Sequence, residues 1–406
     1  MRILHVIPAV AARYGGPSQV IFAMCRALMA QGVEPLIVTT DADGPGHLPV
    51  ELGHPIDYRG VPVLFFPRQC SEALKYSRPL AHWINRHIRQ FDAAHIAAVF
   101  SHASIATAHA CRTHRVPYIV RPLGSLATWS MQQKPWRKRL LWHVAAKRML
   151  YGSAAIHFTS REEQRQAESR FQLHQGVVIA LGLNEGLCSS DLRMARQSFR
   201  QRHPALGPHP FVLALARLHP VKQTELLIHA FLDLLTQADL QTWKLIIAGD
   251  GQPDYVQSLQ TLVRQRSGEA SVLFTGWLDG VEKHAALQEA ALLAQPSLHE
   301  NFGLSIAEAM ASGTPVLVSP QVNLAEDIHR AHAGWVVPCE RQAVRETLQD
   351  VLRQPDERHA RGSAGRAFVR KHYAWSRVAG QLIQLYQSIC RMPSQPITTP
   401  MLEHQI

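Results

Sequence analysis

Two carboxylates on either side of a predicted helix start have the most evident chemistry in this sequence. Glu300 and Glu308 lie in the segment Leu298–Ser319, which reads LHENFGLSIAEAMASGTPVLVS. The backbone N–H groups of Asn301–Ser305 fall at that helix start, where unpaired donors and the helix dipole favour an anion. Carboxylates accept hydrogen bonds from hydroxyl groups, so the segment suits a phosphate joined to a sugar. A capped helix with one exposed acid accounts equally well for the pattern.

The residues around these acids predict the elements that must position them. Leu292–Ser297 and Pro315–Ser319 are short apolar runs typical of buried strands, and Leu304–Ser312 has helical apolar spacing. Gly313 is placed to end the helix. In open parallel sheets, ligands bind at the carboxyl ends of the strands, and the acids follow the first of these strands.

Two cations follow another predicted strand, Phe211–Ala216. They are Arg217 and Lys222, in the run RLHPVK. A diphosphate carries about two negative charges, whereas a helix start offers about half a positive charge, so added cations would be useful. Either residue alone would be unremarkable on a loop.

Alternating strands and helices predict an α/β chain with two doubly wound parallel sheets. The first strand is expected at Arg2–Pro8, with a glycine turn after it and a helix capped by Ser18. A polar loop is expected at Asp41–Tyr58, and Thr224 is expected to cap a helix in the second half. The 406 residues, 46% of them hydrophobic, are enough for two or three domains.

Composition limits the classes of partner. The net charge is +11, but no nucleic-acid-binding signature or aromatic interleaving accompanies it, so nucleic acid is not an expected partner. The six cysteines lack Cys-x-x-Cys spacing, which favours reduced thiols in a cytoplasm, and the first residues are not a signal peptide. His95, His102 and His109 recur every seven residues across a predicted strand–helix junction, so we expect no metal site.

A basic amphipathic helix is predicted over residues 134–151, which read KPWRKRLLWHVAAKRMLY. Cationic side chains mixed with tryptophan, leucine and valine are typical of a helix that lies on an anionic membrane. Leu140, Leu141, Val144 and Met149 are the expected apolar surface. An ordinary solvated helix packed on its domain is the alternative.

The segment ENFGLSIAEAMASGTPV resembles the E-x7-E motif of retaining glycosyltransferases of family 4, and residues 93–120 resemble bacterial exopolysaccharide-biosynthesis members of that family. The resemblance implies the GT-B fold, with two Rossmann-like domains facing across a cleft. Residues 1–195 would form the acceptor-side domain, and residues 208–375 the nucleotide-sugar-binding domain. The helix 376–390 would return to the first domain, and the tail 391–406 is expected to be disordered.

The resemblance also implies roles for individual residues. Glu300 would contact the donor sugar and Glu308 the donor ribose, while Arg217 and Lys222 would clamp the diphosphate. Ala216 and Gln223 stand where the family usually has glycines beside this pair. The other donor-binding candidates are Gly15, Gly16, Gly249, Leu278, Asn301, Phe302, Gly303 and Leu304.

One departure from the family lies at Pro122-Leu123-Gly124. Many members carry a histidine at the position of Leu123, close to the reacting sugar, so no catalytic histidine is assigned here. Arg121 is a candidate for part of the charge in the cleft. We interpret the variant as a subfamily trait.

The implied reaction transfers a sugar from a nucleotide-diphosphate-sugar donor to a hydroxyl of a glycan or lipid-linked acceptor, in exopolysaccharide or cell-surface polysaccharide synthesis. We expect no cofactor and no metal, because cations and helix N–H groups handle the charge of the leaving group. The expected location is cytoplasmic, peripheral at the inner face of the plasma membrane. A nucleotide-sugar epimerase and a non-catalytic nucleotide-sugar-binding scaffold remain alternatives.

Overall fold

The computed structural model describes residues 1–132, 135–183, 191–278 and 280–391. The chain divides into two compact units: unit 1 is Met1–Gly182 with Trp375–Ile406, and unit 2 is Leu183–Ala374. Unit 2 begins before the expected boundary at 195, because helix α8 (Asp191–Arg202) packs on α11 (Gly280–Glu289). The tail expected from 391 lies outside the described residues, except for its first residue.

The sheet of unit 1 has eight strands in the order β10-β9-β8-β7-β1-β2-β6-β5, and only β5 is antiparallel to its neighbour. The predicted loop over 41–58 is wrong in part, because it contains β5 and a small β3–β4 ribbon. The strands are β1 (Arg2–Ala9), β2 (Glu34–Thr40), β3 (Ala42–Asp43), β4 (Gly46–His47), β5 (Pro55–Asp57), β6 (Pro62–Phe66), β7 (Ala93–Ala97), β8 (Tyr118–Arg121), β9 (Ala155–Phe158) and β10 (Gly176–Val178).

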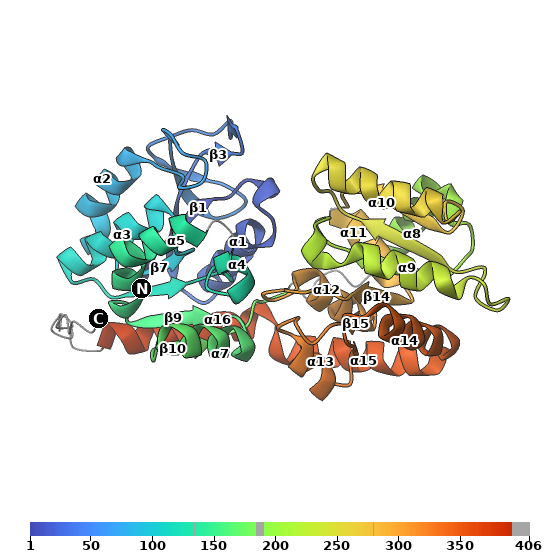
Figure 1. Ribbon diagram of the computed structural model, residues 1–406. Helices are drawn as coiled ribbons and strands as arrows, with labels where there is room; N and C mark the ends of the chain where they lie inside the picture. The colour runs from blue at the N-terminus through green and yellow to red at the C-terminus, as the bar shows by residue number, and fades with distance from the viewer. Residues whose placement is uncertain (133–134, 184–190, 279, 392–406) are drawn as a thin grey trace, which may run out of the picture. The chain divides into compact units, whose positions relative to one another are not determined.

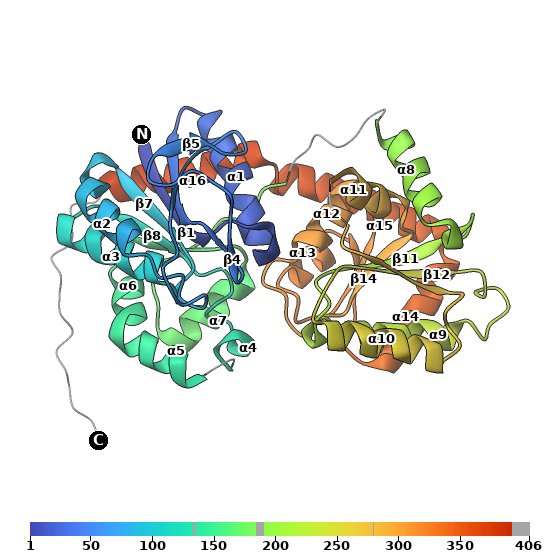
Figure 2. The same cartoon turned by 90° about the horizontal axis from the view of Figure 1, so that it is seen from above.

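Helices cover both faces of this sheet (Figure 2), and each face has its own apolar core. The helices are α1 (Gly16–Met29), α2 (Arg78–His87), α3 (His102–His114), α4 (Thr128–Gln132), α5 (Pro135–Leu141), α6 (Lys147–Tyr151), α7 (Arg161–Phe171) and α16 (Trp375–Arg391). Figure 1 draws α16 in red beside the strands of unit 1, where it packs against α1. The prediction that Ser18 caps α1 is wrong, because Gly15 is the N-cap and the Ser18 hydroxyl donates to the carbonyl of Ala9.

The sheet of unit 2 has six parallel strands in the order β13-β12-β11-β14-β15-β16. They are β11 (Phe211–Leu215), β12 (Lys244–Ala248), β13 (Val272–Gly276), β14 (Leu292–Gln295), β15 (Val316–Val318) and β16 (Gly334–Val336). Figure 2 shows α9, α10 and α14 on one face and α8, α11, α12 and α15 on the other. The further helices are α9 (Thr224–Leu234), α10 (Pro253–Gln265), α12 (Leu304–Ser312), α13 (Ala325–Arg330), α14 (Arg341–Arg353) and α15 (Pro355–His372).

Two sequence predictions for unit 2 differ from the structure. Helix α10 is not predicted, although Pro253 is well suited to a first helical turn. Thr224 does not cap α9, because the helix begins at Thr224 and its N-cap is Gln223, which has a left-handed backbone with a φ of 55°.

In each sheet, successive strands of the chain are added toward one edge and then, from a single switch point, toward the other edge. In unit 1 this point lies between β1 and β7, and in unit 2 between β11 and β14. The loops leaving these neighbouring strands turn to opposite faces of the sheet, and they leave room for a ligand at the carboxyl edge. The fold therefore favours one binding position per unit. No helix in the described part of the chain combines the length and apolarity needed to cross a membrane.

Candidate functional site

The candidate site of unit 2 is built from the loops that follow β11 and β14. The N–H of Leu298 donates to the carbonyl of Val221 at 2.8 Å, which joins the two loops. The loop after β15 is held to the same place, since the N–H of Asn323 donates to the carbonyl of Glu300 at 3.1 Å. Because backbone hydrogen bonds connect all three loops, their side chains have fixed positions relative to one another.

Glu300 is held by two side chains, one from the loop after β11 and one from the end of β14. Its Oε2 accepts a hydrogen bond from Nζ of Lys222 and another, of 3.0 Å, from Nε2 of Gln295. The oxygen of the Gln295 amide accepts from the hydroxyl of Ser305 at 3.0 Å, which orients the amide. The expected cation and the expected sugar-binding acid therefore form one ion pair, 13% and 19% exposed. Partial burial strengthens this pair compared with one on the open surface.

The start of α12 offers backbone donors. Its N-cap, Gly303, has a φ of 74°, and no side chain caps the helix. The first N–H groups of a helix have no partner within it, so those of Leu304 and the next residues are available to an anion. Asn301 and Phe302 precede this turn, and the Phe302 ring is buried against Tyr373, with ring centroids 5.5 Å apart. Phe302 can therefore present only its backbone to a ligand.

Glu308 also has a lysine partner. Its Oε1 lies 2.7 Å from Nζ of Lys283, which comes from α11. The two acids flanking the start of α12 are thus each paired with an ammonium group from another segment. Paired in this way, both carboxylates are held in a fixed geometry.

Arg217 contrasts with the two lysines. Its side chain is exposed, and it makes no hydrogen bond or ion pair with any other residue that the structure describes. It follows β11 directly, so it stands at the switch point of the sheet. Arg217 is the cation of the site that is available to an added phosphate.

Gly249 lies where two neighbouring loops touch. It has a φ of 143°, and a Cβ there would lie 1.9 Å from the carbonyl oxygen of Ala216. The N–H of Gly249 donates to the carbonyl of Gly276 at 2.7 Å. Leu278 follows shortly after Gly276 and has a buried side chain, so only its backbone could contact a ligand. Glycine is needed at 249 because the two backbones approach too closely for a side chain.

The structure brings most of the predicted site residues together in unit 2, while Gly15 and Gly16 lie in unit 1, at the start of α1. Three residues beside the site were missed in the sequence: Lys283, Gln295 and Ser305. Gln295 ends the otherwise apolar strand β14, and a polar residue at that end is a signal that could have identified it. The described residues contain no cluster of three or more histidine, cysteine or acidic side chains able to hold a metal ion.

Comparison with protein families finds two matching models. Residues 15–182 match the model described as glycosyl transferase 4-like domain. Residues 195–368 match the model described as glycosyl transferases group 1. The two matches fall on unit 1 and unit 2 respectively, and the second includes every candidate residue of unit 2.

Individual relatives agree with these families. The phosphatidyl-myo-inositol mannosyltransferase of Mycobacterium leprae is 27% identical over 266 residues, which cover 64% of this chain and 63% of the relative. An uncharacterized glycosyltransferase of Methanocaldococcus jannaschii is 29% identical over 48% of this chain and 49% of its own length. The chain therefore matches about half to two thirds of these relatives.

Solved structures match over nearly the whole chain. The Anabaena protein HepE, solved with UDP and glucose, has a TM-score of 0.75 and 18% identity, covering 96% of this chain and 100% of its own. Sucrose-phosphate synthase from Thermosynechococcus elongatus has a TM-score of 0.76 and 20% identity, covering 96% and 98%. At these identities the likeness concerns the fold, which is GT-B.

Proposed function

Because this chain belongs to the GT4-type glycosyltransferases, we propose that it transfers a sugar from a nucleoside diphosphate donor to a hydroxyl group of a glycan or lipid-linked acceptor. One observation carries the proposal: both acids flanking the start of α12 are paired with lysines, while Arg217 is exposed on the loop that also carries Lys222. That arrangement supplies acceptors for hydroxyl groups and donors for phosphates at the switch point of one sheet.

In this proposal the diphosphate lies against the uncapped start of α12. The N–H groups of Leu304 and the following residues donate to its oxygens. The Arg217 guanidinium adds a positive charge and can donate two parallel hydrogen bonds. Lys222 supplies a second positive charge while it orients Glu300. Glu300 positions the sugar, Glu308 accepts from the ribose hydroxyls, and the backbone near Leu278 contacts the base.

The transfer step breaks the bond between the anomeric carbon and the phosphate oxygen, and the electron pair of that bond goes to the phosphate. The acceptor oxygen forms the new bond on the same face of the sugar, which would retain the anomeric configuration. Its proton passes to the departing phosphate, so no protein nucleophile is required. Arg217, Lys222 and the helix N–H groups stabilise the developing charge, and the step is proposed to need no metal.

Two donor classes are the first to test. HepE was solved with UDP-glucose, and relatives of this chain include mannosyltransferases described as GDP-mannose-dependent. The serotype-specific mannosyltransferase WbdA of Escherichia coli is 30% identical over 44% of this chain, covering 22% of WbdA. We propose a role in the synthesis of cell-surface or exported polysaccharide; one protein of similar fold, WaaG, is described as involved in lipopolysaccharide biosynthesis.

Calorimetry with UDP and GDP tests the nucleotide site. We expect one nucleotide to bind the wild type, and Arg217→Ala to weaken that binding at least tenfold, whereas Arg264→Ala on the exposed side of α10 leaves it unchanged. Equal affinity in both variants would contradict the clamp. Product analysis with the matching donor then separates transfer from the alternatives: an epimerised donor would indicate an isomerase, and binding without turnover a scaffold.

We also propose that the segment 135–151 contacts an anionic membrane. Trp136, Leu140 and Val144 are spaced at intervals of four residues and are 67%, 60% and 65% exposed. Arg139, Lys147 and Arg148 are also exposed on this segment. The segment is α5, a π-helical turn (Trp142–Ala146) and α6 in succession. Met149, expected on this surface, is buried in the core instead. Exposed apolar side chains flanked by cations suit an interface that carries a lipid-linked acceptor.

Vesicle sedimentation tests this surface. The wild type is expected to sediment with vesicles containing phosphatidylglycerol and much less with pure phosphatidylcholine. The double variant Trp136→Ser/Leu140→Ser should lose most of this binding, while Met194→Ser, an equally exposed residue of unit 2, should not. Binding that is unaffected by the double variant would place the membrane contact elsewhere.

A further inference from the structure

Arg121 is a buried cation that the unit 2 site does not use. It ends β8, is 4% exposed, and its side chain makes no hydrogen bond or ion pair with another described residue. Its Nε is buried without a partner. Burying a charged group without hydrogen bonds costs free energy of folding. A residue of this kind is therefore expected where a bound ligand supplies the missing hydrogen-bond partner.

The nearby carboxylate does not pair directly with Arg121. Both oxygens of Glu163 are already used: one accepts from the backbone N–H and hydroxyl of Thr159, both at 2.8 Å, and the other from the N–H of Gly124 at 3.0 Å. Glu163 therefore attracts Arg121 only through space. Burial lowers the pKa of Arg121 to about 10, which leaves the guanidinium charged at neutral pH.

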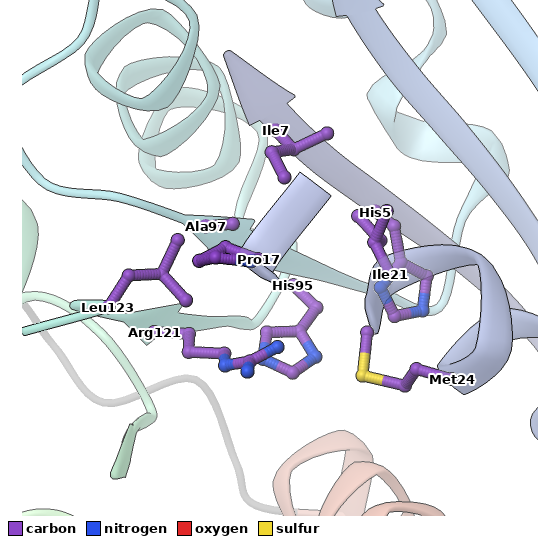
Figure 3. A pocket seen from close by; sticks show the side chains of 9 residues that line it. All are labelled: His5, Ile7, Pro17, Ile21, Met24, His95, Ala97, Arg121 and Leu123. Atoms are coloured by element: carbon purple, nitrogen blue, oxygen red, sulfur yellow. The ribbon is translucent and has the colours of Figure 1, made fainter. Parts of the chain in front are cut away.

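Arg121 faces a small cavity together with a second unpaired group. His5 from β1 lines the same cavity, and its buried Nε2 has no partner. Figure 3 shows Arg121, His5, Pro17 and Leu123 around this space. Burial lowers the pKa of His5 to about 3, so this ring is neutral and can donate one proton.

The position of the cavity is where the fold expects a ligand. Its lining comes from β1, β7 and the end of β8, at the switch point of unit 1. Pro17 follows the pair Gly15-Gly16, and Leu123 adopts a left-handed backbone with a φ of 56°. Such strain in a non-glycine residue is concentrated at functional sites.

We infer that Arg121, assisted by His5, binds a carboxylate or phosphate group of a substrate in unit 1. A guanidinium presents two parallel N–H groups that match the oxygens of either group. The cavity has a volume of about 10 Å³, roughly the space of one oxygen-sized atom, so it takes only an oxygen of the charged substituent. The inference rests on the proposed function for the identity of the substrate, whose charged group belongs either to an acidic acceptor or to the nucleotide donor.

Thermal melting of the full chain tests the site. We compare the wild type with Arg121→Gln, Arg121→Lys and Arg89→Gln, an exposed arginine of unit 1 that controls for the lost charge. Arg217→Ala weakens phosphate binding in unit 2. In chloride at fixed ionic strength, Arg121→Gln should melt at the same temperature as the wild type or higher. Glucuronate should raise the melting temperature of the wild type, Arg89→Gln and Arg217→Ala but not of Arg121→Gln, and inorganic phosphate should raise that of Arg121→Gln less than that of the wild type.

The inference is overturned if neither anion protects the wild type more than Arg121→Gln. If Arg121→Gln does not fold, the site is tested by calorimetric titration of phosphate into Arg217→Ala. Absence of phosphate binding in that titration overturns the inference. Titration with UDP and GDP distinguishes the two possible sources of the charged group, the nucleotide donor and an acidic acceptor. An at least tenfold loss of nucleotide affinity in Arg121→Gln assigns the site to the donor, whereas unchanged affinity with lost glucuronate protection assigns it to an acidic acceptor. If phosphate binds through Arg121 and no nucleotide binds the wild type, the proposed function fails while the anion site stands.

Discussion

The ammonium group of Lys283 lies 2.7 Å from Oε1 of Glu308, and the two residues come from neighbouring helices of unit 2. Both side chains are about one fifth exposed, so the pair is partly shielded from water. In the proposed complex Glu308 accepts from the ribose, and Lys283 holds the carboxylate in position. Lys283 is therefore a positioning residue, which acts on the donor through Glu308.

Removing Lys283 should weaken donor binding with a smaller effect on turnover. For Lys283→Met we expect the donor KM to rise about tenfold, which corresponds to about 1.4 kcal/mol, with kcat changing less. Steady-state kinetics check this, with Lys244→Met as control, since Lys244 is a half-buried lysine of β12 that donates to the carbonyl of Ala270. In a double-mutant cycle with Glu308→Gln the two effects should not add, and full additivity would show that the residues act independently.

Substitution of Glu300 should affect mainly turnover, whereas substitution of Lys222 should affect mainly nucleotide binding. Glu300→Gln keeps the size of the side chain and removes the charge that positions the sugar, so kcat should fall about a hundredfold or more. Its affinity for the free nucleoside diphosphate should stay close to that of the wild type. Lys222→Met should instead weaken nucleotide binding about tenfold. Calorimetry and initial rates measure both, and a large loss of nucleotide affinity in Glu300→Gln would contradict the assigned roles.

The close approach of two loops at Gly249 predicts a severe effect of one added methyl group. In Gly249→Ala the Cβ would lie 1.9 Å from the carbonyl oxygen of Ala216, so the loops must separate. We expect a loss of about 3 kcal/mol or more in the free energy of unfolding. Gly276→Ala is the control, since Gly276 has a φ of 72° but open space around it. It should cost only about 1–2 kcal/mol, from its backbone conformation. Equal effects in urea denaturation would show that the contact is unimportant.

Three buried histidines should make unit 1 sensitive to acid. Burial lowers the pKa of His5 and of His157 to about 3 and that of His95 well below its usual value. The unfolded chain then binds more protons than the folded chain between about pH 3 and 6.5. Stability is fully present above pH 6.5 and is lost as the pH falls through this window.

At pH 5 the loss from His5 alone is about 2 kcal/mol. Glu163, whose pKa burial raises, acts in the opposite direction and offsets part of the total. Urea denaturation at pH 7.5 and pH 5 measures the difference. In His5→Leu the difference should shrink by about 2 kcal/mol, whereas His54→Asn, on the exposed surface, should leave it unchanged. An unchanged difference in His5→Leu would mean that His5 is protonated in the folded protein.

A hydrogen-bonded chain of rings attaches the last helix to unit 1. Nε2 of His157 donates to the carbonyl of Ile179 at 2.8 Å, so its Nδ1 accepts from Nε2 of His95 at 3.2 Å. Nδ1 of His95 is left to accept from the hydroxyl of Tyr386 on α16, at 2.8 Å. Because a carbonyl can only accept and the rings are neutral, the direction of every bond follows.

Tyr386→Phe should therefore leave the buried Nδ1 of His95 without a donor. The expected loss in the free energy of unfolding is about 1–3 kcal/mol. Tyr76→Phe is a suitable control, because Tyr76 is half-buried and its hydroxyl makes no hydrogen bond to another described residue. Guanidinium denaturation measures both, and equal stabilities would show that the chain of rings does not hold α16.

Local sequence patterns were enough to locate most strands and helices of both sheets, because apolar runs and helical periodicity report directly on which face of an element is buried. They also singled out Glu300, Glu308, Arg217 and Lys222, because these residues flank loops at strand ends. The caps expected at Ser18 and Thr224 are wrong, since the tertiary structure uses the Ser18 hydroxyl to hold β1 and starts α9 one residue after a left-handed Gln223.

Only the tertiary structure decided which charges meet. Lys222 and Glu300 are 78 residues apart, and His95 and Tyr386 are 291 apart, so their contacts depend on the order of strands in each sheet. The burial of the Arg121 side chain without a partner is likewise invisible in the sequence, which made Arg121 only a candidate for part of the charge in the cleft. Periodicity records how one element meets its surroundings, whereas a pairing or an orphaned charge depends on several distant elements at once. For that reason the sequence indicated which chemical groups the site contains, whereas only the tertiary structure showed which of them are paired.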